Sequence, residues 1–162
     1  RLKQAQKRLR LLGSPSPRME RDLVAWNRIE APGQPTTIPG ALIVAHDVIG
    51  GVFALDGGAF GAGRGTVFYF APDTLSWEDT EQGYTDFLRW CAAGDLERFY
   101  ASARWPSWRD EVAPLSADQG ILLYPPLWSS EGQEPARAQR SVVAMAELWR
   151  LHQEYRAQLA GP

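Results

Sequence analysis

The sequence predicts one α+β domain, in which a mostly antiparallel sheet of four or more strands is packed by helices. Three β-rich apolar runs separated by glycines lie between residues 41 and 79. From residue 84 onwards, apolar residues recur every three or four positions, the period of an amphipathic helix. The 162 residues fit one domain and can bury a core without disulfides or metals. We therefore expect residues 1–162 to form a single domain, with 1–18 as a basic N-terminal arm and 129–141 as a mobile loop.

Composition excludes several classes of protein. The net charge is −2 and 22% of the residues are charged, which favours neither a disordered chain nor a protein that binds polyanions with its whole surface. The single cysteine, Cys91, cannot form an internal disulfide and suits a reducing compartment. No apolar run reaches the roughly 18 residues of a membrane span, and the N-terminus lacks the apolar core of a signal peptide. We expect a cytoplasmic protein that does not bind membranes.

The N-terminal residues predict a short basic helix. Apolar residues in 1–12 fall on one helical face, and Gly13 is placed to end the helix. The basic residues of 1–10 could bind nucleic acid or a membrane, or they could form an ordinary solvated face. We favour the solvated face, because ten residues carry too little apolar area to anchor by themselves. Nucleic acid is therefore not the expected partner. Residues 19–27 predict a second short helix, and 30–40 a loop rich in proline and glycine.

The central region predicts three strands. Residues 41–45 are continuously apolar, as expected of a strand that is covered on both faces. Residues 46–51 predict a turn and 52–55 a returning strand, so the pair forms a hairpin. A flexible glycine-rich loop over 56–65 leads to a third strand at 66–70, which is rich in β-branched and aromatic residues.

Helices predominate after the third strand. Residues 84–93 share an aromatic face that includes Phe87 and Trp90, with Gly94 as the residue after the helix and Asp95 as the N-cap of the next. That second helix is expected to run to Ala103.

Three further elements complete the prediction. Pro106 suits the first turn of a helix that reaches Val112. Residues 121–124 predict a fourth strand, and an apolar stripe from Met145 to Leu159 predicts a C-terminal helix.

The glycine-rich loop resembles a phosphate-binding loop only superficially. It lacks the lysine of a Walker loop, and a strand follows it where a phosphate loop needs a helix. His46 and Asp47 are adjacent in an extended segment and so point to opposite faces. His152 lies on an apolar stripe, and the few histidine and cysteine residues are far apart in the sequence. We expect no catalytic residue, no metal site and no cofactor.

Aspartates near strand ends leave an enzymatic alternative open. Four of them are candidates for a shared site: Asp47, Asp56, Asp73 and Asp118. Two carboxylates brought together could transfer protons or hold a cation for a small-molecule or metal-dependent enzyme. Aspartate is also a common turn residue, so each of them has a structural explanation.

Tryptophans supply the second set of candidates. The chain holds seven tryptophans, five tyrosines and six phenylalanines, which predicts an aromatic-heavy core. Four tryptophans are candidates for an exposed binding face: Trp77, Trp105, Trp108 and Trp128. Aromatic rings with arginine neighbours, here Arg104 and Arg109, are typical of interface hot spots. Core packing is the alternative explanation for the same rings.

Several stretches resemble the bacterial family DUF2625, whose function is unknown. They are LRLLGSPSPRM (9–19), ALIVAHDVIGGVFALDGGAFG (41–61), GTVFYFAPDTLSWEDTEQGYTDFLRWCAAGDLERFY (65–100) and DQGILLYPPLW (118–128). The family usually has a longer region before Leu9. His46 stands where another residue is expected, which weakens a catalytic role for it.

The order of strands, glycine turns and the YTDFLRW helix is more distantly similar to the SMI1/KNR4 (SUKH) superfamily. This resemblance implies an α+β fold and, for many members, an immunity role in which a toxin is bound. We therefore expect a non-enzymatic, immunity-like or regulatory module that binds another protein. An enzyme that uses the turn carboxylates is the alternative.

Overall fold

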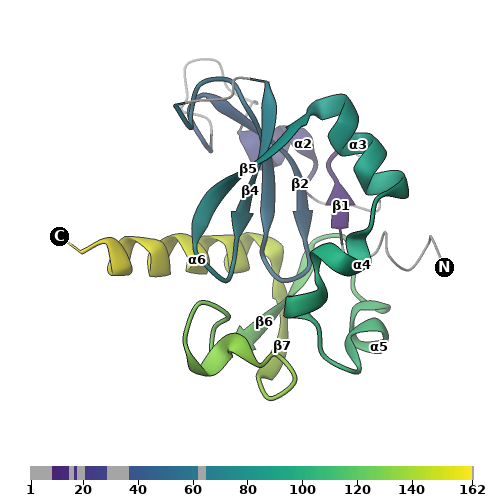
Figure 1. Ribbon diagram of the computed structural model, residues 1–162, viewed down its shortest axis with the longest axis vertical. Helices are drawn as coiled ribbons and strands as arrows, with labels where there is room; N and C mark the ends of the chain where they lie inside the picture. Colours follow the sequence, from purple (N-terminus) through teal and green to yellow (C-terminus); the bar gives the residue numbers. More distant parts are fainter. Residues whose placement is uncertain (1–8, 15–16, 18–20, 29–36, 62–64, 162) are drawn as a thin grey trace.

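A five-stranded antiparallel sheet forms the centre of the computed structural model (Figure 1). The structure describes residues 9–14, 17, 21–28, 37–61 and 65–161. The strands follow one another in chain order: β1 (Leu9–Leu11), β2 (Ala41–Asp47), β3 (Val52–Asp56), β4 (Thr66–Ala71) and β5 (Ser76–Gly83). The predicted α+β class with an antiparallel sheet of four or more strands is confirmed.

The β2–β3 hairpin is largely buried within the sheet. Ala41 pairs with Asp56 at one end and His46 with Val52 at the other. The middle of β2 is buried on both faces, as its unbroken apolar run predicts. Gly50 has φ +93° in the turn, and a Cβ atom there would collide with the His152 ring. The predicted hairpin is confirmed, although His46 and Asp47 belong to the strand and not to the turn.

Helices cover both faces of the sheet. Phe53 and Tyr69 face α3 (Tyr84–Ala93) and α4 (Leu96–Phe99). Val52 and Phe70 face the other way, toward α2 (Leu23–Asn27) and α6 (Met145–Ala160), and Figure 1 shows α6 running across the strand direction. The Asn27 side chain bonds both the N–H and the C=O of Ile43, at 2.7 and 2.8 Å, which fixes α2 against β2. Among the described helices, none is long and apolar enough to cross a bilayer.

A second sheet of two strands packs at the turn end of the hairpin. It consists of β6 (Gln119–Tyr124) and β7 (Gln139–Ala144), with α5 (Trp108–Val112) and the short 3₁₀ helices η1 (Ala101–Ala103) and η2 (Glu131–Gln133) nearby (Figure 1). The Ile121 N–H donates to the Val48 carbonyl at 2.6 Å, and the two residues share a hydrophobic cluster. The strand predicted at 121–124 therefore exists, but it pairs with β7 and not with the main sheet.

The N-terminal helix prediction is wrong for its described part. Residues 9–11 form the edge strand β1, in which Leu9 pairs with Asp47 and Leu11 with Ala45. Residues 1–8 of the expected basic arm lie outside the described residues. Arg10 on β1 donates through Nη1 to the carbonyls of Ala117, at 2.9 Å, and Gln119, and so ties the two sheets together. The predicted helical spacing of apolar residues extends over only four described residues here, 9–12. Pairing with the open edge of β2 outweighs it, and residues 9–11 form a strand.

Two polar strands are not predicted by the sequence. β5 has no buried residue, and β7 begins inside the range 129–141 that we expect to be a loop. Residues 131–133 of that range form η2, so only its remaining residues are irregular. Arg140 on β7 donates to the Glu111 carboxylate at 2.8 Å, which anchors the strand. The mobility of the irregular part stays a prediction.

The predicted end of the helix at Gly94 is confirmed, but glycine is not required there for a left-handed backbone conformation. α3 ends at Ala93, and the Gly94 N–H donates to the Trp90 carbonyl at 2.7 Å. Gly94 has an ordinary φ of −76°, yet a Cβ atom there would collide with the Trp90 ring. Asp95 caps α4 as predicted, accepting from the Arg98 N–H at 2.9 Å.

Candidate functional site

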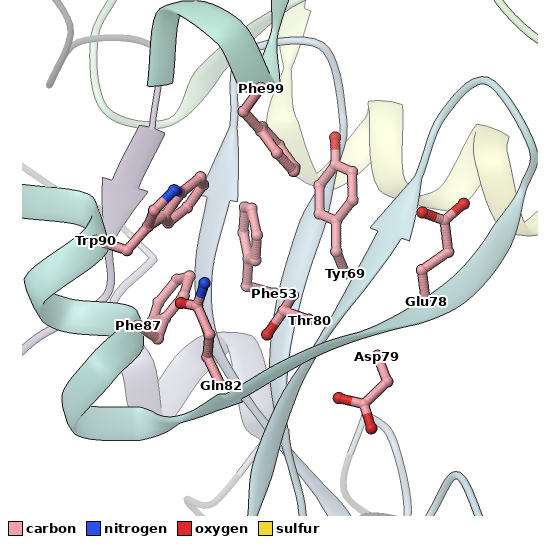
Figure 2. A pocket seen from close by; sticks show the side chains of 9 residues that line it. All are labelled: Phe53, Tyr69, Glu78, Asp79, Thr80, Gln82, Phe87, Trp90 and Phe99. Atoms are coloured by element: carbon pink, nitrogen blue, oxygen red, sulfur yellow. The ribbon is translucent and has the colours of Figure 1, made fainter. Parts of the chain in front are cut away.

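A pocket of about 250 Å³ lies between the sheet and the α3–α4 segment (Figure 2). Five aromatic rings line it: Phe53, Tyr69, Phe87, Trp90 and Phe99. Four residues of β5 complete the lining: Glu78, Asp79, Thr80 and Gln82. The pocket is therefore an aromatic chamber with a polar and acidic edge.

Strand register builds the sheet side of this pocket. Phe53 on β3 pairs with Tyr69 on β4, and Tyr69 pairs in turn with Glu78 on β5. Directly paired residues share one face of a sheet, so these three side chains form a row. Figure 2 shows Phe53 and Tyr69 standing side by side on neighbouring strands.

The two helices supply the other side. Phe87 and Trp90 are three residues apart on α3 and therefore share a helical face. The Phe99 ring lies 5.0 Å from Trp90 and 5.2 Å from Tyr69, both in edge-to-face geometry. Phe53 and Phe87 are fully buried, whereas Phe99 is 39% exposed. Phe53 and Phe87 thus form the buried interior of the pocket, and Phe99 lies at its accessible opening.

Tyr69 is held by a buried hydrogen bond. Its hydroxyl donates to Oδ2 of Asp47 at 2.9 Å, and Oδ1 of Asp47 accepts from the N–H groups of Ile49 and Gly51 at 3.0 and 2.8 Å. Burial and the Asp47 charge raise the pKa of Tyr69 well above its ordinary value. Tyr69 is therefore a fixed, neutral wall of the pocket and not a general base.

The polar edge offers one open hydrogen-bonding atom. Oε1 of Gln82 is buried and has no partner within the described part of the chain. Figure 2 places the Gln82 amide beside Phe87 and Trp90. Thr80, by contrast, donates its hydroxyl to the Val67 carbonyl at 2.6 Å. A ligand with an N–H group could satisfy Gln82, since buried acceptors are nearly always paired.

Negative charge is concentrated beside the pocket. Residues 71–88 hold five acids and no lysine, arginine or histidine; the acids are Asp73, Glu78, Asp79, Glu81 and Asp86. β5 is the last strand of the main sheet, so its outer edge pairs with no other strand of that sheet. Only Asp86 of these acids forms an ion pair within the described residues, with Arg89 at 2.9 Å. The potential at this edge favours a cation.

Comparison with known proteins identifies the family. The sequence pattern described as "Protein of unknown function DUF2625" matches residues 5–148. The chain belongs to the DUF2625 family. It is 46% identical over 144 residues to a putative uncharacterized protein, YbfG, of Escherichia coli K12, an alignment that covers 88% of this chain. It is 40% identical over 119 residues to an uncharacterized protein of Haemophilus influenzae, covering 74% of this chain. No solved structure matches the chain.

The alignments cover 63% of the Escherichia relative and 52% of the Haemophilus relative. This DUF2625 chain therefore spans less than two thirds of either protein.

The structure of this DUF2625 chain does not bring the four candidate aspartates together. Asp47 and Asp56 lie at opposite ends of the β2–β3 hairpin. Oδ1 of Asp56 accepts from the N–H groups of Gly58 and Ala59, both at 2.8 Å, so this carboxylate shapes its own turn. Asp73 is exposed in the β4–β5 turn.

Asp118 lies on the loop before β6, where it accepts from the Arg21 N–H at 3.1 Å. Among the four acids, Asp47 and Asp118 both interact electrostatically with Arg10. In the described ranges, no group of three or more histidine, cysteine or acidic side chains could hold a metal ion.

Two of the four candidate tryptophans are core residues. Trp105 and Trp108 are only 2% and 4% exposed, which corrects their assignment to a binding face. Arginines cover their rings: the Arg104 guanidinium carbon lies 4.9 Å from the Trp108 ring centre, and that of Arg140 lies 5.3 Å from Trp105. Arg104 and Arg109, the neighbours that suggested an interface, thus both lie over the buried Trp108 ring.

Trp77 and Trp128 are half-buried. Trp77 packs on Phe60 and Phe70, with ring centres 4.7 and 5.4 Å apart, and Trp128 packs on Tyr155 at 5.4 Å. Both belong to the α6 side of the sheet, away from the aromatic pocket. The pocket residues Trp90, Phe99 and Gln82 were not singled out as a site. The signal that could have found them is the aromatic face of 84–93 together with the acidic run just before it.

The buried side chains of His46, His152 and Cys91 are uncharged at neutral pH. Burial lowers the pKa of His46 to about 3, with Arg10 adding to the effect, and lowers that of His152 to about 4. Burial also raises the pKa of the Cys91 thiol to about 12. These groups are therefore uncharged components of the packing, as expected for a histidine on an apolar stripe and a cysteine on a buried helical face.

Proposed function

We propose that this DUF2625 domain is a non-enzymatic binding module that captures a basic segment of a partner protein. The observation that carries the proposal is the coincidence of the five-ring pocket with the acidic edge strand β5. A lysine or arginine side chain of the partner would enter the pocket, and the partner backbone would run along β5.

Two physical effects support a cationic occupant. A cation near the face of an aromatic ring gains about 0.5–2 kcal/mol, more when water is excluded. Glu78 and Asp79 lie at the edge of the same pocket and add long-range attraction for positive charge. Gln82 offers an acceptor for the ammonium or guanidinium N–H groups.

Pocket size favours a side chain over a cofactor. The volume of about 250 Å³ is below the roughly 300–1,000 Å³ of pockets that hold drug-sized molecules. An open strand edge can also accept an added strand, in which main-chain hydrogen bonds supply affinity and a side-chain pocket supplies specificity.

This proposal includes an immunity-like or a regulatory role in the cytoplasm. In an immunity-like role the partner is a toxin, as we infer from the resemblance of the sequence pattern to the SMI1/KNR4 superfamily. The alternative, an enzyme that uses turn carboxylates, is less well supported because its four aspartates do not meet in one site and Asp47 and Asp56 are committed to their own turns. Because the chain covers part of its relatives, the activity of a whole family protein is also a proposal.

Selection from a random peptide library displayed on phage tests the proposal. Peptides that bind the purified protein should carry lysine or arginine at one recurring position. Phe99→Ala and the double variant Glu78→Gln/Asp79→Asn should each weaken the best peptide roughly fivefold, as expected for one lost cation–π contact or its charge support.

Matched controls are available on the surface of the protein. Tyr124→Ala removes an exposed aromatic ring elsewhere, and Glu134→Gln removes an exposed charge next to Arg137. Neither should change the affinity. Selected peptides without a recurring cation, or equal weakening by pocket and control variants, would exclude this site.

A further inference from the structure

We propose that a second cleft, between α2 and α6, binds a small organic phosphate. The cleft has a volume of about 510 Å³ and lies on the sheet face opposite the aromatic pocket. Arg21, Trp26 and Arg28 line it from the α2 side, and Glu147, Arg150 and Gln153 line it from α6. The proposal does not depend on the function proposed above, because the two sites share no residue and prefer opposite charge.

Unpaired donors are the first observation. Trp26 is 3% exposed, yet its indole Nε1–H has no acceptor among the described residues. The amide nitrogen Nε2 of Gln153 is buried and equally without a partner there. Buried donors are nearly always satisfied in folded proteins. Two of them lining one cleft indicate a ligand that is rich in acceptor oxygens.

Arginines are the second observation. Arg21 and Arg28 form no ion pair within the described residues, and the Arg21 guanidinium carbon lies 5.5 Å from the Trp26 ring centre. Arg150 is paired with Glu154 one helical turn away, but both side chains are largely exposed. A guanidinium group presents paired N–H donors that match a phosphate better than a halide.

The position of these groups is fixed by the fold. Asn27 binds both backbone groups of Ile43, so the neighbouring Trp26 and Arg28 are held against the sheet. Arg28 has φ +54° at the end of α2, and its N–H donates to the Ala25 carbonyl at 3.4 Å. The α2 side of the cleft is therefore preformed, which lowers the ordering cost of binding.

Size and the remaining lining favour an organic phosphate over the bare anion. The volume falls in the range of small-molecule pockets. Trp149 lines the cleft, and its half-buried ring stands 5.2 Å from Phe70, which offers an apolar wall for the organic part. Glu147 can accept from a ligand hydroxyl or amino group, and it disfavours a ligand that is only an anion.

An NMR titration tests this site. The indole N–H resonances of the ¹⁵N-labelled protein are followed while inorganic phosphate, ribose 5-phosphate or AMP is added, with sodium chloride at matched ionic strength. The Trp26 resonance is assigned by its loss in Trp26→Phe. We expect this resonance and the Gln153 side-chain amide to shift with the two organic phosphates, at lower concentration than with inorganic phosphate.

Variants separate a specific site from weak attraction to the surface. Arg28→Gln, which changes an exposed side chain at a helix end, and Trp26→Phe should each weaken binding about tenfold, as for one charge-assisted hydrogen bond. Arg89→Gln, at an exposed arginine of α3 outside both sites, is the matched control and should leave the affinity unchanged. A Trp26 resonance that stays still at millimolar AMP and ribose 5-phosphate would overturn the proposal. Equal effects of Arg28→Gln and Arg89→Gln would overturn it too.

Discussion

Tyr69 and Asp47 are joined by a buried hydrogen bond of 2.9 Å that connects the wall of the aromatic pocket to the β2–β3 turn. The same carboxylate accepts from Ile49 and Gly51, so one side chain fixes both the turn and the tyrosine. Pocket shape and hairpin stability therefore depend on the same group, and changes at the turn should be felt at the pocket.

Replacing Tyr69 by phenylalanine should destabilise the protein. The change keeps the ring but leaves Oδ2 of Asp47 without the Tyr69 donor in a buried position. Loss of one partner of a buried carboxylate costs about 1–3 kcal/mol. Urea denaturation measures the difference. Tyr124→Phe, at a ring that is 64% exposed, is the control and should change the free energy of unfolding very little. Equal stabilities of the two variants would contradict the prediction.

Gly51→Ala tests the same connection from the turn. A Cβ atom at Gly51 would collide with Oδ2 of Asp47 and the Tyr69 ring. Both groups are buried and hydrogen-bonded, so neither can move aside easily, and overpacking of this kind costs about 1–3 kcal/mol. Gly13→Ala is the matched change, because no atom lies within 4 Å of its Cβ position. Thermal unfolding should show a lower midpoint for Gly51→Ala alone.

Mild acid should weaken the fold through its two histidines. Their folded pKa values, about 3 for His46 and about 4 for His152, lie below the ordinary 6.5, so the unfolded chain binds more protons. The stability they contribute is complete above pH 6.5 and is lost as the pH falls toward the folded pKa values. Near pH 5 each histidine should lower the free energy of unfolding by up to about 1.4 kcal/mol for every unit by which the pH falls.

Urea denaturation between pH 5 and pH 6.5 measures this slope, in a range where most carboxylates remain ionised. His152→Gln should reduce the slope by the share of one histidine, whatever its effect on stability at pH 7. An unchanged slope in that variant would show that His152 is protonated as readily in the folded state as in the unfolded chain.

Arg140 on β7 should contribute far more to the free energy of unfolding than Arg137, which lies just before the strand. Arg140 donates to Glu111 at 2.8 Å and to the Ala138 carbonyl at 2.9 Å, and it covers Trp105. Arg140→Ala should therefore cost about 1.5–3 kcal/mol. Arg137 pairs with Glu134 at 3.3 Å with both side chains exposed, and Arg137→Ala should cost at most about 0.5 kcal/mol. Chemical denaturation of both variants would reveal the contrast, and a similar loss in each would refute it.

The parts of the fold that could be predicted are those whose local sequence pattern fits only one type of secondary structure. The apolar run of 41–45, the returning strand at 52–55 and the helix at 84–93 each carry a clear period and a clear boundary. β1 has no such pattern. The spacing of Leu9 and Leu12 fits a helix, whereas in the structure Leu9 belongs to the strand and Leu12 to the loop that follows it. The strand structure of β1 depends on the free edge of β2, which only the folded sheet provides.

The candidate site was harder to predict because it is assembled from distant segments. Phe53, Tyr69, Phe87 and Phe99 come from four elements, and their meeting depends on strand register. β5 could not be predicted from its own sequence, because that sequence is polar. It forms a strand because it pairs with the edge of β4. Trp105 and Trp108 were misassigned because arginine beside an aromatic ring occurs both at interfaces and over buried rings.

Arg10 sets a practical limit on how far the domain can be trimmed. Its guanidinium spans from the first strand to the carbonyls of Ala117 and Gln119 at the start of β6. A shortened version that begins after Leu11 would lose the outermost strand together with this cross-brace. The smaller sheet would then be held by contacts such as the Ile121–Val48 hydrogen bond and the hydrophobic cluster that these two residues share. Fragments for crystallisation should therefore start upstream of Leu9.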